Sequence, residues 1–140
     1  MSRVIHTSSP GKRRSQLRRT VAELLRRLML KRNLDEEAKD MVAAVVFALR
    51  GIDETIEEST VAWEKRNYFL KADRFRRRWE WVAVAAARLR KLVVNDHWEQ
   101  LPHELAALAP YFTDVRVIKL TRPPSTWKSS YLLLKREGKV

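Results

Sequence analysis

The feature that most constrains the fold is the stretch from Lys65 to Asn95, in which apolar residues recur every three or four positions. This spacing is the repeat of one buried face of an α-helix. The stretch therefore predicts a core helix. The residues on its predicted buried face are Phe69, Ala72, Phe75, Trp79, Val82, Ala83, Ala86, Leu89 and Val93.

The other side of the same predicted helix is rich in arginine. At about 100° per residue, Arg74, Trp81 and Arg88 lie seven positions apart and almost in line, and Arg77, Arg78 and Lys91 lie beside them. One interpretation packs Trp81 against a neighbouring helix or subunit, with arginines extending around it. In the other, Trp81 is exposed and stacks on an unpaired base while the arginines neutralise phosphates.

A first helix is predicted to begin between residues 9 and 15, because Ser9 precedes Pro10 as an N-cap residue would. Asn33 is placed to end it. Its apolar stripe consists of Leu17, Val21, Leu24, Leu25 and Leu28, and its opposite side carries Lys12, Arg19 and Arg26. The first helix is therefore amphipathic and basic.

A second, acidic helix is predicted from Asp35 to about Arg66. Residues 35–64 have a net charge of −7, compared with +9 for residues 1–34 and +8 for residues 65–95. Gly51 projects away from the apolar stripe of this helix. Asn67, which tolerates the left-handed conformation, marks the break before the next helix.

Three acids of the second predicted helix, Asp53, Glu57 and Glu64, lie along one edge of its apolar stripe. Aligned carboxylates hold metals in some helical bundles, where histidines on the same helices complete the site. None of the three histidines, His6, His97 and His103, lies on the second or third predicted helix. We therefore expect the acids to pair with arginines of neighbouring helices, and we expect no metal site.

Shorter elements are predicted after Asn95. The sequence DHWE, beginning at Asp96, resembles a capping box for one short turn. A helix from His103 to Ala109 follows Pro102, and Pro110 ends it. We then expect a short extended segment over residues 114–120 and a final helix from about Thr126 to Glu137. One face of that final helix carries Trp127, Tyr131 and Leu134.

Composition indicates a folded protein with a heavily charged surface, since 45% of residues are hydrophobic and 33% are charged. Three glycines and five prolines favour a few long helices over many short strands. The absence of cysteine excludes disulfides, thiolate zinc sites and cysteine nucleophiles. The longest uncharged apolar run, Met41–Leu49, is too short to cross a membrane, so we expect a soluble, cytoplasmic protein. Residues 1–8 carry no pattern and are expected to be mobile.

The formal net charge of +12 predicts an anionic partner. Nucleic acid ranks first, because a phosphate chain offers repeated charge and releases counterions on binding. An acidic protein or an anionic membrane surface would respond to the same charge.

A resemblance to a known family points the same way. The helix order across residues 17–112, the segment KADRFRRRWEW at residues 71–81 and the basic balance resemble the accessory variability determinants, small four-helix proteins that accompany reverse transcriptases in diversity-generating retroelements. Related proteins are encoded in ribosomal-RNA intervening sequences. The resemblance implies a non-catalytic, ring-forming, nucleic-acid-binding partner of an enzyme. It does not cover the tail from Thr113 onward, and no functional residue carries over.

The sequence thus predicts an all-α, antiparallel up-and-down helical bundle of about four main helices over residues 1–112, with a C-terminal extension over residues 113–140. We expect neither enzymatic activity nor a cofactor, because the sequence shows no nucleophile paired with a base, no set of metal ligands and no phosphate loop.

The favoured function is binding of RNA or DNA through phosphate contacts, without sequence specificity and as part of a larger complex. The expected contact residues are Lys12, Arg19, Arg26, Arg74, Arg77, Arg78 and Arg88, with Trp81 as a stacking residue. The alternative is an oligomeric scaffold or protein-interaction module whose basic face meets an acidic protein or its own acidic helix. The sequence leaves homo-oligomerisation open.

Overall fold

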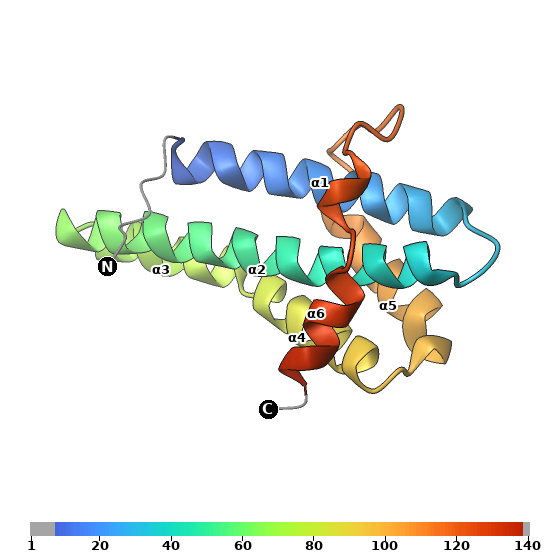
Figure 1. Ribbon diagram of the computed structural model, residues 1–140. Coiled ribbons are helices and arrows are strands. Elements are labelled where there is room, and N and C mark those ends of the chain that lie inside the picture. The colour runs from blue at the N-terminus through green and yellow to red at the C-terminus, as the bar shows by residue number, and fades with distance from the viewer. Residues whose placement is uncertain (1–7, 139–140) are drawn as a thin grey trace.

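The computed structural model describes residues 8–138, so most of the N-terminal segment expected to be mobile lies outside the described residues. Three long, roughly antiparallel segments lie side by side (Figure 1). The first is α1 (Pro10–Leu30), the second is α2 (Glu36–Lys65), and the third consists of α3 (Phe69–Trp79) followed by α4 (Trp81–Val94). Residues 8–138 contain no β-strand. The predicted all-α, up-and-down bundle is confirmed.

Two shorter helices complete the bundle. α5 (Leu101–Leu108) packs against α4, and α6 (Ser130–Glu137) crosses α2 and also contacts α4 (Figure 1). Single 3₁₀ turns at Trp98–Gln100, Ala109–Phe112 and Pro124–Thr126 connect these elements. None of the helices in the part of the chain that the structure describes is long and apolar enough to cross a membrane.

Three of the predicted helix boundaries are confirmed, those at Ser9, Asp35 and Asn67. The Ser9 hydroxyl accepts a hydrogen bond from the Lys12 backbone N–H at 3.2 Å, and the Asp35 carboxylate accepts one from the Ala38 N–H at 2.8 Å. Asn67 has a φ of 64° and separates α2 from α3. The prediction that Asn33 ends α1 is wrong by three residues, because α1 ends at Leu30.

The core lies between the three long segments and receives side chains from every α-helix except α3, whose buried residue is Ala72. Its fully buried large residues include Leu24 of α1, Met41, Leu49 and Ile52 of α2, and Leu89 of α4. Leu105 and Leu108 of α5 extend this core. The apolar stripe predicted for α1 therefore lies in the core from Val21 to Leu28, and Leu17 packs against it half-buried.

The core helix predicted over residues 65–95 is interrupted at Glu80, although the Glu80 backbone stays in the right-handed helical region. Trp79 and Trp81 flank this break, and their ring centroids are 6.1 Å apart with the rings nearly parallel. On a continuous helix, residues two apart point in different directions. The indoles of Trp79 and Trp81 nevertheless lie close together across Glu80.

The predicted buried face of this helix is only partly correct. Phe69 is 58% exposed because it begins α3 at the tip of the α2–α3 hairpin. Ala83 is exposed too, whereas Leu92, which is not among the predicted buried residues, is buried. Ala72, Val82, Ala86, Leu89 and Val93 are buried as expected.

The C-terminal extension packs on the bundle and shares its core. Trp127 and Leu134 are buried within the main cluster. The predicted start of the final helix at Thr126 is wrong, because Ser129 adopts a left-handed conformation with a φ of 63° and α6 begins at Ser130. The predicted extended segment is irregular chain without strand pairing.

The prediction that Gly51 projects away from the apolar stripe of α2 is wrong, because Gly51 faces α1. A Cβ atom at this position would lie 2.8 Å from Cδ1 of Leu17. The missing side chain therefore allows α1 to approach α2 closely.

Candidate nucleic-acid interface

α3 presents a row of exposed basic side chains. Lys71, Arg74, Arg77 and Arg78 are exposed, and we refer to these four residues as the α3 basic surface. Arg77 forms an exposed ion pair with Asp73 at 3.0 Å. Arg74 and Arg78 have no carboxylate partner within residues 8–138. Three of the residues predicted to contact phosphates are thus on one helix and accessible.

Part of this surface lines a groove of 410 Å³. Its lining residues are Trp63, Leu70, Lys71, Arg74, Phe75 and Arg78. The Lys71 ammonium lies 4.3 Å from the centre of the Trp63 ring. The rings of Trp63 and Phe75 pack edge to face, with a centroid distance of 5.0 Å. The groove therefore combines three cations with aromatic walls and contains no acid.

Arg76 points from α3 to the acidic helix instead. Its guanidinium donates two hydrogen bonds to the Glu64 carboxylate, at 2.8 and 3.0 Å, and lies 3.6 Å from Glu57. The hydrogen bonds from Arg76 lower the pKa of Glu64. The predicted pairing of α2 acids with neighbouring arginines is therefore confirmed for Glu57 and Glu64.

Asp53, the third of the aligned acids, does not follow that prediction. It has no ion pair within the described part of the chain. Partial burial, together with the negative charge of Glu57, raises the pKa of Asp53. Among residues 8–138 no group of acids and histidines is arranged to hold a metal ion.

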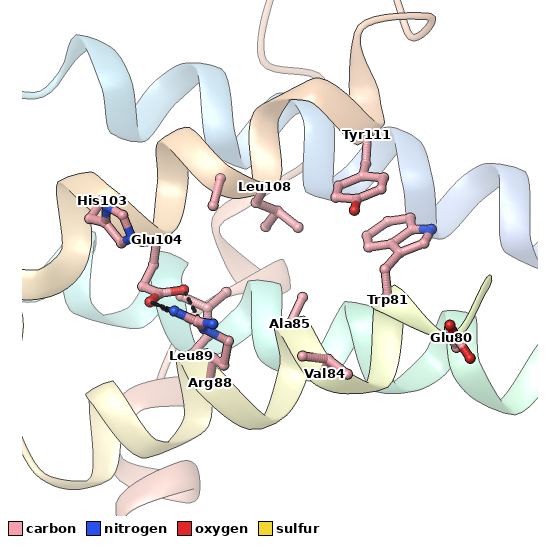
Figure 2. A pocket seen from close by; sticks show the side chains of 11 residues that line it. Glu80, Trp81, Val84, Ala85, Arg88, Leu89, His103, Glu104, Leu108 and Tyr111 are labelled. Atoms are coloured by element: carbon pink, nitrogen blue, oxygen red, sulfur yellow. Dashed lines mark hydrogen bonds and ion pairs between the residues drawn. The ribbon is translucent and has the colours of Figure 1, made fainter. Parts of the chain in front are cut away.

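Trp81 is half-buried and packed in an aromatic cluster. Its ring stacks on Tyr111 with a centroid distance of 3.9 Å and an interplanar angle of 9°, and it meets the edge of Phe112 at 5.8 Å. Figure 2 shows Tyr111 and Trp81 together at one end of a pocket between α4 and α5. Because Tyr111 covers one face of the indole, an unpaired base would have to displace it to stack there.

The pocket beside Trp81 has a volume of 490 Å³ and a mainly apolar lining that includes Val84, Ala85 and Leu108 (Figure 2). Arg88 closes its far end, where the guanidinium donates hydrogen bonds to the Glu104 carboxylate, the shortest at 2.9 Å. This contact raises the pKa of Arg88. Arg88, predicted to contact phosphate, is thus already paired with an acid and links α4 to α5.

Two of the predicted contact residues on α1 bind the C-terminal extension. Arg19 donates a hydrogen bond to the Arg116 carbonyl at 2.9 Å, and Arg26 donates one to the Val117 carbonyl. The side of α1 opposite its apolar stripe is therefore partly covered by the chain after α5. Lys12, near the start of α1, remains exposed.

The sequence analysis missed the role of Glu23, whose side chain is completely buried on α1. Its carboxylate accepts hydrogen bonds from the backbone N–H groups of Thr121 and Arg122, the Thr121 hydroxyl and the Arg19 guanidinium. Burial alone would raise the pKa of Glu23, but these hydrogen bonds outweigh it and lower the pKa. The one signal in the sequence was that Glu23 is the only acid in residues 1–34.

Asp96 has a similar role at the other end of the extension, and the predicted capping box is wrong. Its carboxylate accepts hydrogen bonds from the Tyr131 hydroxyl and the Lys135 ammonium, both at 2.5 Å, and from the Trp98 ring N–H at 3.0 Å. The contact with Lys135 is the main cause that lowers the pKa of Asp96 to about 2. Asp96 therefore anchors α6 and does not cap the turn that follows it.

The two histidines that the structure describes, His97 and His103, are exposed and belong to no group arranged to hold a metal ion, and His6 lies outside the described residues. In comparisons with known proteins, the chain matched no family model, no curated protein and no solved structure. The residues themselves are therefore the basis of the functional proposal.

Proposed function

We propose that this protein is a non-catalytic nucleic-acid-binding protein that contacts phosphates through the α3 basic surface, as part of a larger complex. The observation that carries the proposal is the groove in which Lys71, Arg74 and Arg78 lie beside Trp63 and no acid is present. Cations that are free of protein carboxylates are available to neutralise phosphates. The resemblance to accessory variability determinants, noted from the sequence, would imply the same class of function.

The contact set is narrower than the sequence suggested. Arg74, Arg77 and Arg78 stay in the proposed interface and Lys71 joins them, because all four are exposed on one helix. Arg19, Arg26 and Arg88 leave it, since they bind backbone carbonyls or an acid of the same chain. Trp81 leaves it because Tyr111 covers one face of its ring. Lys12 remains exposed but lies on α1.

The test is the salt dependence of binding to a fluorescein-labelled 20-nucleotide oligo(dT), followed by fluorescence anisotropy. For single strands, the slope of log K against log[salt] is about −0.7 per neutralised phosphate, so three or four contacts give a slope of roughly −2 to −3. The double variant Arg74→Gln/Arg78→Gln removes two contacts and should reduce the steepness of this slope by about 1.4. A flat salt response would reject the proposal.

The matched control is Arg27→Gln/Arg136→Gln, which removes the same charge from two exposed arginines on α1 and α6. We expect this control to leave most of the slope unchanged. An equal loss in both double variants would show that only the net charge matters, and it would reject the α3 basic surface as the interface.

A second candidate function, an oligomeric scaffold or protein-interaction module, is favoured by the tip of the α2–α3 hairpin. Four large apolar side chains are exposed there, on Val61, Tyr68, Phe69 and Leu70. Exposed apolar clusters of this kind are typical of protein interfaces. Sedimentation equilibrium of the wild type and of Phe69→Ser/Leu70→Ser tests this candidate. It requires that the wild type forms an assembly larger than a monomer and that the double variant does not.

A further inference from the structure

The C-terminal end of α1, which lies at the opposite end of the bundle from α3 (Figure 1), carries exposed apolar side chains. Met29 is 61% exposed and Leu30 is 67% exposed, although both lie directly after the buried Leu28. Leu34, in the loop that follows, is also exposed. Apolar residues gathered in this way on a surface usually mark an interaction site.

Two apolar grooves meet at Met29. The first has a volume of 270 Å³ and lies between α1 and the chain from Ala109 to Val117. The second has a volume of 400 Å³ and lies between the α1–α2 loop and α5. Met29 lines both grooves. We call the two grooves and the exposed side chains of Met29 and Leu30 the Met29 surface.

The charged residues that line the two grooves are all basic. Arg26 lines the first groove, Lys31 and Arg32 line the second, and neither lining contains Asp or Glu. Lys31 is compensated by ion pairs with Asp35 and Glu37. Arg26 and Arg32 have no carboxylate partner within residues 8–138, and the Arg26 guanidinium contacts only the Val117 carbonyl.

We propose that the Met29 surface binds an acidic amphipathic helix of a partner protein. Two apolar side chains of that helix, one turn or two turns apart, would fill the grooves on either side of Met29, which is the usual arrangement of a helix in a groove. Carboxylates beside the apolar stripe would pair with Arg32. Methionine suits such a contact because its flexible side chain adapts to the shape of the partner.

The composition of the surface separates it from the proposed nucleic-acid interface. Its exposed apolar side chains are aliphatic, so they offer no aromatic face on which a base could stack. The α3 basic surface, in contrast, has the exposed cations and the Trp63 ring in one groove. The two proposals therefore concern different residues and different partners, and one can fail while the other holds.

The probe is a fluorescein-labelled 18-residue peptide of Leu and Glu, arranged with one apolar stripe on an α-helix, titrated with the full-length protein and followed by anisotropy. A second peptide keeps the same leucines and replaces every Glu by Lys. We expect the acidic peptide to bind at least tenfold more tightly than the basic one. The substitution Met29→Glu should weaken this binding at least tenfold, and Arg32→Gln about threefold.

Leu132→Glu is the matched control, since Leu132 is 52% exposed on α6 and lines neither groove. It should leave the peptide affinity unchanged, and circular dichroism should show the same helix content in every variant. Equal binding of both peptides, or binding that Met29→Glu does not change, would overturn the proposal. Two other results would also overturn it, each in the absence of peptide binding. One is self-association of the wild type in sedimentation that Met29→Glu abolishes, and the other is binding to phosphatidylglycerol vesicles that Met29→Glu abolishes.

Discussion

The buried carboxylate of Glu23 provides the sharpest test of how the C-terminal extension is held. In Glu23→Ala, the backbone N–H groups of Thr121 and Arg122 and the Thr121 hydroxyl lose their acceptor. Each hydrogen bond to a charged group contributes about 1.5–3 kcal/mol. The contributions do not simply add, because the released chain can be hydrated and because Arg19 is already 36% exposed. We therefore expect a loss of about 2–4 kcal/mol in the free energy of unfolding.

Urea denaturation and thermal unfolding measure this loss. For a chain of this length, the loss corresponds to a decrease in Tm of roughly 10 °C. Hydrogen exchange gives the local readout, since the amides of Thr121 and Arg122 should lose their protection in the variant. Glu54→Ala is the control, because Glu54 is exposed, and its free energy of unfolding should change by less than about 0.5 kcal/mol.

The pH dependence provides an independent check of the same reasoning. The pKa of Glu23 is lower in the folded protein than its ordinary value of 4.5. The carboxylate therefore stabilises the fold above pH 4.5, and this stabilisation is lost as the pH falls through the folded pKa. The difference in stability between wild type and Glu23→Ala should be full at pH 7 and should decrease below pH 4.5. A difference under 0.5 kcal/mol at pH 7, or unchanged protection of Thr121, would refute the role of Glu23.

Three further predictions concern α6. Asp96→Asn should reduce the acid sensitivity of α6 docking, because in the wild type the contribution of Asp96 is lost as the pH falls from its ordinary pKa of 3.8 to about 2. The sensitivity that remains belongs to Glu137, which pairs with Arg50 and also has a lowered pKa. Hydrogen exchange in α6 measures both contributions. Burial, followed by the contact with Asp96, raises the pKa of Tyr131 to about 12, so absorbance at alkaline pH should show one late tyrosine, absent in Tyr131→Phe. A Cβ atom at Gly138 would collide with the Val94 side chain, so Gly138→Ala should lower the free energy of unfolding by about 1–3 kcal/mol.

Local rules predicted the helices well, because they depend on residues a few positions apart. Ser9 and Asp35 cap their helices through N–H groups three residues later. Asn67 adopts the left-handed conformation, which asparagine tolerates better than most residues do. The apolar stripes of α1 and α2 were likewise sufficient to predict that both helices contribute to the core.

The sequence did not show which neighbour covers each face. Periodicity placed Trp81 among arginines, but the residue that covers its ring, Tyr111, is thirty positions later and belongs to a 3₁₀ turn. Arg19 and Arg26 lie opposite the apolar stripe of α1, as predicted, yet they bind the carbonyls of the chain that crosses there. Pairings over such distances leave no repeat in the sequence.

The same limit explains why the candidate interface is smaller than predicted. Arg88 belongs to the same arginine-rich side as Arg74 and Arg78 in the pattern, and only the placement of α5 distinguishes it, because α5 brings Glu104 within hydrogen-bond distance of the Arg88 guanidinium. The sequence does not distinguish an exposed arginine from one that is paired with an acid. That distinction requires the relative placement of two helices.

The long separation between Glu23 and its hydrogen-bond donors has a consequence for synthesis on the ribosome. Thr121 follows Glu23 by 98 residues, so the nascent chain forms α1 long before the groups that will surround this carboxylate have emerged. Until then Glu23 keeps its hydration shell, and the apolar residues next to it stay partly exposed to solvent. The final consolidation of α1 therefore waits for the last quarter of the polypeptide to leave the exit tunnel.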